Sequence, residues 1–271
     1  MAQRVTIFGC GVQKGGTTTL HAYFAEHPQL SAPLRKETHF FDDETQDWSW
    51  PDYRLHDAFY KSDDGAKLRF DITPIYGYWP PTLGRIAAYN GQAKLITLWR
   101  DPFKRAYSHW KMQRARRVEK LGFSEALAAE EERLHAAGET GEGRRLYSYV
   151  DRGRYATQLR HAEALFPRAQ ILNLRSEDLF RTPVETLARI AAFLEIDPFP
   201  EMAPKHEMKR ERHEAPPTRA DFDHIAAALE GELAEFAALS GLDVSGWMKP
   251  PSDAPAPAPK KGFFARLTGR G

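Results

Sequence analysis

The 271-residue chain contains one cysteine, Cys10. A single thiol cannot form an intramolecular disulfide, so the composition fits a reducing compartment. The N-terminus has no apolar leader, and no run of about 18 apolar residues is free of charges. We therefore expect a soluble, cytoplasmic protein. Lys and Arg (38) nearly balance Asp and Glu (37), so no global basic field indicates nucleic acid as a partner.

The sequence also lacks the spacings that bind metals. The ten histidines are scattered, without a His-Glu-x-x-His pattern, and one cysteine cannot supply a cysteine pair. We therefore expect no metal. Cys10 follows an apolar run and is interpreted as a small buried thiol rather than a nucleophile.

Hydrophobic residues (42%) and aromatic residues (12%) are sufficient for one large α/β domain with a buried core. Short β-rich runs at residues 4–8, 68–72, 94–99 and 170–174 alternate with longer helical patterns. This alternation predicts a three-layer, P-loop-like sandwich, in which helices flank a central, mainly parallel sheet. Helical spacing predicts a helix over residues 183–194, and apolar residues recur at helical spacing at Ile225, Leu229, Leu233 and Phe236.

The composition changes near Met248, so we place the domain at residues 1–248 and a tail at residues 249–271. The tail begins with a Pro/Ala-rich linker that cannot form a core. Its end combines basic residues with large apolar ones, which predicts peripheral contact with an anionic membrane; the alternative is a solvated, flexible tail. The basic residues are Lys260, Lys261, Arg266 and Arg270, and the apolar ones are Phe263, Phe264 and Leu267.

A glycine-rich loop, Gly-Val-Gln-Lys-Gly-Gly-Thr-Thr-Thr at residues 11–19, follows the first predicted strand. Glycines allow a tight turn, and the amides of the following helix N-terminus attract an anion. Aligned with the nucleoside-triphosphate pattern G-x-x-x-x-G-K-[ST], the loop has Thr17 at the lysine position and Lys14 inside the turn. The loop thus predicts a phosphate site without the usual γ-phosphate lysine. A ligand-free strand-to-helix turn is the alternative.

A second anion site is predicted where the strand at residues 94–99 ends in Arg100. An Asp-Pro pair then starts a helix that carries Ser108 two turns later. Arg100 can bind phosphate oxygens bidentately, and the hydroxyl of Ser108 can reach the same group. A buried Arg100–Asp101 structural pair is the alternative.

Between these sites, Lys36 and Glu37 precede two phenylalanines at residues 40–41. A carboxylate beside a lysine and an aromatic wall is suited to accept a proton from a hydroxyl or amine. Taken alone, the pair could equally be a solvated salt bridge.

Together these motifs resemble the PAPS-dependent sulfotransferases (PAPS, 3′-phosphoadenosine-5′-phosphosulfate), particularly the heparan sulfate N- and O-sulfotransferases and their bacterial relatives. The resemblance spans roughly residues 5–247. It implies Glu37 and Lys14 as catalytic residues and Lys36, His39, Thr73 and Tyr76 as acceptor contacts. The implied cofactor-binding residues are Lys14, Gly15, Gly16, Thr17, Thr18, Thr19, Arg100, Ser108, Tyr155 and, in a late basic loop, Lys209 and Arg210.

The resemblance further implies in-line transfer of a sulfuryl group from PAPS, which leaves adenosine 3′,5′-bisphosphate. A carbohydrate or glycolipid acceptor is favoured. Basic residues on the predicted helix near residues 104–120 could attract an anionic glycan, although such a run is usually a solvated face. Two alternatives remain: a P-loop nucleotide-dependent kinase, which would require magnesium, and a non-catalytic nucleotide- or glycan-binding module.

Overall fold

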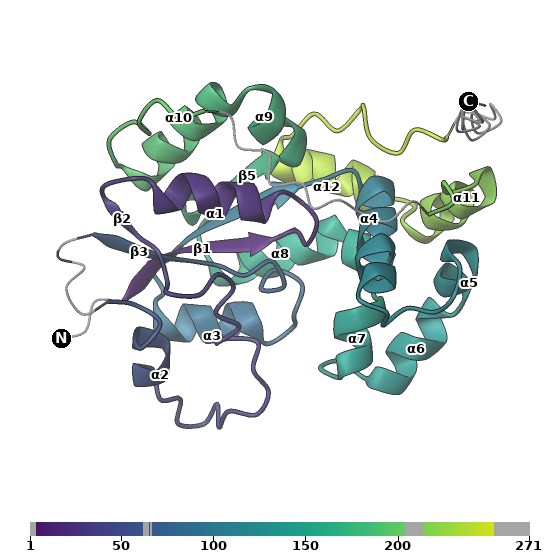
Figure 1. Ribbon diagram of the computed structural model, residues 1–271, viewed down its shortest axis with the longest axis horizontal. Coiled ribbons are helices and arrows are strands. Elements are labelled where there is room, and N and C mark those ends of the chain that lie inside the picture. The colour runs from purple at the N-terminus through teal and green to yellow at the C-terminus, as the bar shows by residue number, and fades with distance from the viewer. Residues whose placement is uncertain (1–3, 62–64, 66, 204–213, 252–271) are drawn as a thin grey trace, which may run out of the picture.

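The computed structural model describes residues 4–61, 65, 67–203 and 214–251 (Figure 1). Its centre is a parallel sheet with the strand order β2-β3-β1-β4-β5. The strands are β1 (Val5–Gly11), β2 (Leu30–Ser31), β3 (Leu68–Ile72), β4 (Lys94–Trp99) and β5 (Ile171–Arg175). Because all neighbouring pairs are parallel, the loops that follow β1, β3 and β4 meet at one edge of the sheet.

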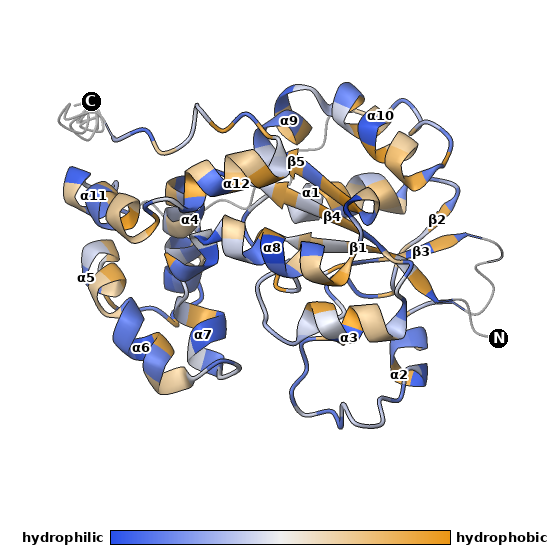
Figure 2. Ribbon diagram, turned by 180° about the vertical axis from the view of Figure 1, so that it is seen from behind, coloured by the Kyte–Doolittle hydropathy of each residue, from blue (hydrophilic) through white to orange (hydrophobic). Residues whose placement is uncertain are grey.

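Helices cover both faces of the sheet, and the alternation of side chains along each strand explains why. Ile7 and Ile96 pack with α1 and α10, whereas their neighbours Phe8 and Leu95 pack with α3 and α8 on the opposite face. Figure 2 shows the strands as mainly hydrophobic between the two helical layers. The helices of these layers are α1 (Thr17–Ala25), α9 (Ser176–Arg181) and α10 (Pro183–Leu194) on one side, and α3 (Thr82–Tyr89) and α8 (Tyr155–Leu165) on the other.

Further helices form a group at one end of the molecule (Figures 1 and 2). Their shared core includes Phe103, Trp110, Phe123 and Ile225. The group consists of α4 (Pro102–Ala115), α5 (Phe123–Ala128), α6 (Glu130–Ala137), α7 (Glu142–Tyr147) and α11 (Arg219–Ala228). The remaining elements are α2 (Arg54–Asp57), α12 (Glu232–Ser240), which packs on α8, and the short 3-10 turns η1 (Asp151–Gly153) and η2 (Arg168–Gln170).

The observed sheet agrees with the predicted α/β sandwich, with three differences. β1 extends to Gly11, β5 starts at Ile171, and β2 has only two residues and no sequence pattern of its own. The apolar residues from 225 to 236 do not form one helix. Gly231 adopts a positive φ of 79° and separates α11 from α12, so Ile225 and Phe236 belong to different core clusters.

The predicted helix at residues 183–194 is observed as α10, with Pro183 at its first position. At the end of the domain, Trp247 packs against Tyr155 and Phe236, and Met248 donates its backbone N–H to Asp101 Oδ2 at 3.1 Å. The predicted tail contact with a membrane depends on residues 252–271, which lie outside the described residues. Within the described part of the chain, no helix has the length and apolarity needed to cross a bilayer.

Candidate active site

The glycine-rich loop connects β1 to α1 at the carboxyl edge of the sheet (Figure 1). Gly16 precedes the helix, which has no acidic residue in its first turn and no side-chain cap. The first-turn amides are therefore available to an anion that the helix dipole favours. Thr17 and Thr19 are buried and Thr18 is exposed, so the three predicted hydroxyl ligands point in different directions.

The two glycines of the turn are required for steric reasons. A Cβ atom at Gly15 would lie 2.5 Å from the carbonyl oxygen of Leu98 and 2.8 Å from that of Val12. Gly16 adopts a φ of 94°, a conformation that favours glycine, and a Cβ there would meet the ring of Phe180 at 3.0 Å. The loop is further held to β4 by the N–H of Val12, which donates to Leu98 O at 2.9 Å.

Arg100 connects the two predicted anion sites. Its Nη1 atom donates to the backbone carbonyl of Lys14 at 2.7 Å, across a sequence separation of 86 residues. Asp101 does not form the alternative structural pair with Arg100: it caps α4 by accepting from the N–H groups of Phe103 and Lys104 at 3.0 and 3.2 Å. Arg100 therefore supports the glycine-rich loop from the end of β4.

Of the other predicted cofactor-binding residues, Tyr155 contacts the backbone of Arg100 and Ser108 lies on the helix that follows it. Ser108 is buried on α4, in the first half of the helix that begins directly after Arg100 and Asp101. Tyr155 is buried against Trp99 and donates its hydroxyl to Arg100 O at 2.8 Å, so it positions the backbone of Arg100. A direct contact of Tyr155 with a cofactor stays a prediction. Lys209 and Arg210 lie outside the described residues.

Lys14 is also within electrostatic range of α4. After burial and the charges of Arg152 and Arg105, the charge of Lys14 contributes to holding the pKa of His109 well below its usual range. His109 directly follows Ser108 on α4. The charge of the loop lysine therefore reaches the helix that carries Ser108.

The segment that carries Glu37 forms a chain of charged contacts. The Lys36 ammonium is hydrogen-bonded to Glu37 Oε1, and His39 Nε2 lies 3.6 Å from Glu37 Oε2. His39 Nδ1 lies 3.0 Å from Asp42 Oδ2, and Asp42 also accepts from Arg145 of α7. The Lys36–Glu37 pair is thus one end of a longer network. It is also not the fully solvated salt bridge considered from the sequence, because the Glu37 side chain is only 35% exposed.

These contacts shift the pKa values of both central groups. Burial raises the pKa of Glu37, but the hydrogen bond from His39 and the charge of Lys36 outweigh it and lower that pKa to about 2. Burial lowers the pKa of His39, whereas Asp42 and then Glu37 raise it, to about 9. At neutral pH the network therefore contains an ionised Glu37 and a cationic His39.

Asp71, at the end of β3, anchors this segment to the sheet. It accepts from Thr38 Oγ1 at 2.6 Å, Thr73 Oγ1 at 2.8 Å and the Tyr76 hydroxyl at 2.8 Å, and His56 Nε2 lies 3.5 Å away. Asp71, Thr73 and Tyr76 are fully buried. The structure thus gives Thr73 and Tyr76 a supporting role through Asp71, and their predicted contact with an acceptor stays a prediction.

The Glu37 segment also lies near α1. Burial, followed by the charge of Lys36, lowers the pKa of His21 on α1, and the charges of Asp71 and Glu37 act on it in the opposite direction. His21 is therefore within electrostatic range of the candidate base and stands on the helix that begins at the anion-binding loop. The candidate base and the helix that follows the glycine-rich loop thus lie in one region of the molecule.

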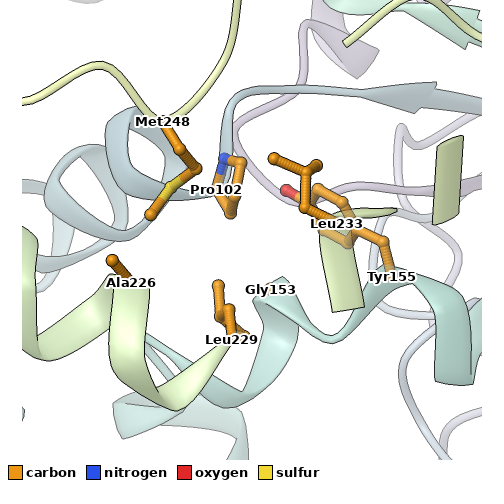
Figure 3. A pocket seen from close by; sticks show the side chains of 7 residues that line it. All are labelled: Pro102, Gly153, Tyr155, Ala226, Leu229, Leu233 and Met248. Carbon is orange, nitrogen blue, oxygen red and sulfur yellow. The ribbon is translucent and has the colours of Figure 1, made fainter. Parts of the chain in front are cut away.

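A cavity of about 880 Å³ lies beside this region, within the size range of about 300–1,000 Å³ that is usual for ligand sites. Thr38, His39 and Asp42 contribute to one side and Arg145 of α7 to another. A second cavity, of about 140 Å³, is small and apolar. Figure 3 shows its lining side chains around Pro102, with Met248 and Ala226 on one side and Leu233 and Tyr155 on the other. Of these two cavities, the larger adjoins the predicted catalytic segment.

Part of the basic run on α4 proves to be structural. Arg105 is fully buried and donates to the carbonyl of Tyr149, and Arg114 donates to Lys120 O at 2.9 Å and lies 3.6 Å from Glu214. Glu119 pairs with Arg133 of α6 at 2.6 Å. These contacts hold Arg105 and Arg114 within the helical group, whereas Lys104, Arg116, Arg117 and Lys120 are exposed. None of the residues of the run lines the larger cavity.

The sequence motifs did not identify three residues of the site. Asp42 and Arg145 form a contact across 103 residues, and His56 reaches Asp71 from a segment without a motif. Only Asp42 could have been found, since it stands three residues after His39. Among the residues described, no group of three or more His, Cys, Asp or Glu side chains could hold a metal ion.

Comparisons with known proteins support the resemblance to sulfotransferases that the sequence motifs indicated. Residues 5–210 match a family model described as the sulfotransferase domain. Human heparan sulfate glucosamine 3-O-sulfotransferase 3B1 is 32% identical over 184 residues, which cover 68% of this chain and 44% of that protein. Human bifunctional heparan sulfate N-deacetylase/N-sulfotransferase 2 is 27% identical over 202 residues, covering 70% of this chain and 22% of that protein. The chain thus spans less than half the length of these curated relatives.

A solved structure extends the match over most of the chain. The crystal structure of a sulfotransferase from Alicyclobacillus acidocaldarius has a TM-score of 0.76 and 25% sequence identity, and covers 91% of this chain and 99% of that one. The resemblance found in the motifs is therefore confirmed at the level of family and fold.

Proposed function

The chain belongs to the sulfotransferase domain family, and from this premise we propose that it transfers a sulfuryl group from PAPS to a hydroxyl or amine of an acceptor. The observation that carries the proposal is the hydrogen bond of 2.7 Å between Arg100 and Lys14 O, which joins an anion-binding loop to a second cationic site. A donor with phosphate groups at two separated positions uses both. The relatives named for heparan sulfate support a carbohydrate acceptor.

In the proposed complex, the glycine-rich loop binds the 5′-phosphosulfate. The amides at the start of α1 and the hydroxyls of Thr17 to Thr19 surround this anion, while Arg100 and Ser108 bind the 3′-phosphate. Lys14 stabilises the charge that grows on the oxygen between phosphorus and sulfur as that bond breaks. The leaving group is adenosine 3′,5′-bisphosphate.

Glu37 takes the acceptor proton. The acceptor oxygen or nitrogen forms a bond to sulfur, the sulfur–oxygen bond to the phosphate breaks, and its electron pair remains on the leaving phosphate. A carboxylate with a pKa near 2 is a weak base towards a free hydroxyl. We therefore propose that the proton moves late, when bonding to sulfur has made the acceptor strongly acidic.

The charge of the transferred group is consistent with a reaction that needs no metal. A sulfuryl group carries one negative charge, whereas a γ-phosphoryl group carries two, so fewer cations are needed around it. This difference also accounts for threonine at the position where nucleoside-triphosphate loops have lysine. The charge of Lys14, inside the loop, is placed instead against the bridging oxygen.

Calorimetric titration with adenosine 3′,5′-bisphosphate and, separately, with ATP and magnesium tests the proposal. We expect the bisphosphate to bind without magnesium and more tightly than ATP. Incubation with sulfur-labelled PAPS then measures transfer to an acceptor panel. Preference for ATP with magnesium would replace the proposal with a nucleotide-dependent kinase, and binding without any Glu37-dependent transfer would indicate a binding module.

A further inference from the structure

The charges that line the larger cavity differ from those that a polyanionic acceptor requires. Proteins that bind carboxylated or sulfated chains present unpaired Lys and Arg side chains to them. Here carboxylates outnumber cations among the described lining residues. The cationic side chains are Arg35, His39 and Arg145, and the carboxylates are Asp42, Asp43, Glu44 and Glu142.

The cationic lining residues already have partners. Arg145 and His39 both contact the buried carboxylate of Asp42, the latter at 3.0 Å. Arg35 donates to the backbone carbonyl of Thr38 at 3.1 Å, and its guanidinium lies 5.4 Å from the centre of the Phe59 ring. These interactions reduce the positive potential that the three residues can offer to a ligand.

Two of the carboxylates have no direct ion-pair partner, although the hydrogen bond from Thr45 and, after it, the charges of Arg145 and Arg85 lower the pKa of Asp43. Glu44 is paired with Arg85 at 2.7 Å. By contrast, Asp43 and Glu142 form no ion pair within 4.0 Å to another described residue, and Asp43 accepts instead from Thr45 Oγ1 at 2.7 Å. Both can accept hydrogen bonds from the hydroxyl groups of a ligand.

The same cavity has an apolar edge. Leu55 and Phe59 contribute to its lining, and Leu55 is 57% exposed. Leu34 is 65% exposed and donates its N–H to the carbonyl of Phe59 at 2.7 Å, so it lies beside the same edge. Sugar rings have apolar faces that pack on such side chains while their hydroxyls bind carboxylates.

We propose that the acceptor is an uncharged sugar, without carboxylate or sulfate groups on the ring that enters this cavity. The proposal rests on the proposed sulfotransferase function and narrows its acceptor class. His39, whose Nε2 atom lies 3.6 Å from Glu37 Oε2, contributes to both the lining and the charged network. A sugar hydroxyl in the cavity is therefore adjacent to the candidate base, and Asp43 and Glu142 repel acidic glycans.

A matched pair of acceptors tests this specificity. One is a heparosan tetrasaccharide, which carries carboxylates; the other is the same tetrasaccharide with its carboxyl groups reduced to hydroxymethyl groups. With labelled PAPS, we expect kcat/KM to be at least about tenfold higher for the reduced form, because like charges at the rim disfavour the other. In an Asp43→Lys/Glu142→Lys variant the preference is expected to reverse. A Glu131→Lys/Glu132→Lys variant, which changes the charge equally on exposed positions of α6, is expected to keep it.

Two outcomes overturn the proposal: an equal or higher kcat/KM for the carboxylated form, and a preference that the rim variant leaves unchanged. If neither tetrasaccharide is sulfated, their binding to the bisphosphate-loaded protein is measured by saturation-transfer NMR. Binding of the reduced form alone supports the proposal, and binding of the carboxylated form, or of neither, overturns it. Failure of adenosine 3′,5′-bisphosphate to bind in the preceding titration identifies failure of the sulfotransferase function itself.

Discussion

The guanidinium of Arg100 lies 2.7 Å from the backbone oxygen of Lys14, so the side chain of Arg100 helps to fix the position of the loop that carries the Lys14 ammonium group. Replacing Arg100 with Ala removes this bond together with the proposed contact to the 3′-phosphate. Since a hydrogen bond to a charged group contributes about 1.5–3 kcal/mol, we expect bisphosphate binding to weaken roughly 10- to 100-fold.

Adenosine 5′-monophosphate, which lacks the 3′-phosphate, is the matched ligand for that titration. Its affinity is expected to change less than that of the bisphosphate in Arg100→Ala. An equal loss for both ligands would show that Arg100 acts only through the loop.

Gly15→Ala is expected to destabilise the protein. The added methyl group would lie 2.5 Å from Leu98 O, so the loop or β4 must move, which costs roughly 1–3 kcal/mol. Urea unfolding measures this free energy. The control is Gly84→Ala in α3, where no atom lies within 4 Å of the new carbon and the free energy of unfolding should rise by about 0.5–1 kcal/mol. Equal effects of the two substitutions would refute the steric argument.

Glu37→Gln is expected to lower kcat by about 10²- to 10⁴-fold, because the amide cannot accept the acceptor proton. Bisphosphate affinity should remain near that of the wild type, which separates a chemical defect from a folding defect. Asp47→Asn, on an exposed position of the same loop region, is the control and should retain activity. A near-normal kcat in Glu37→Gln would remove Glu37 from the mechanism.

The charged network predicts a pH dependence of stability. The pKa of His39 is raised from 6.5 to about 9 in the folded protein, so protonated His39 favours folding. This contribution is complete below about pH 6.5 and is lost as the pH rises through about 9. The difference in Tm between the wild type and His39→Gln should therefore shrink from pH 6 to pH 10. A constant difference across this range would contradict the assignment.

The tail prediction can be tested independently of the fold. Deletion of residues 252–271 removes Lys260, Lys261, Arg266 and Arg270 and, if the tail contacts membranes, abolishes sedimentation with anionic phosphatidylserine vesicles. Neutral phosphatidylcholine vesicles serve as the control. Equal sedimentation of the full-length and shortened proteins would end this idea.

The half of the candidate site that contains the glycine-rich loop and Arg100 could be predicted from the sequence because its determinants are local. The turn at Gly15 and Gly16, the helix start at Pro102 and the position of Arg100 after a strand each follow from a short motif. Element ends were less predictable: Gly231 breaks an apolar repeat that by spacing alone continues to Phe236.

The acceptor half depends on contacts that no local pattern contains. Asp42 meets Arg145 across 103 residues, and Asp71 receives hydrogen bonds from Thr38 and Tyr76, which stand on either side of it in the sequence. Such pairs become visible only when the chain is folded. For the same reason, the sequence could not show that the basic helix lies outside the larger cavity, whose lining has four carboxylates and three cationic side chains.

The anchoring of the Glu37 segment by buried Asp71 has an evolutionary consequence. Asp71 accepts a hydrogen bond from Thr38 and so fixes the segment from the sheet side. Asp43 and Glu142, which line the cavity, are not among the residues that contact Asp71. Substitutions at the rim can therefore accumulate without displacing the candidate base or the donor loop. Descendants of such a chain can change what the cavity binds while they keep the same glycine-rich loop.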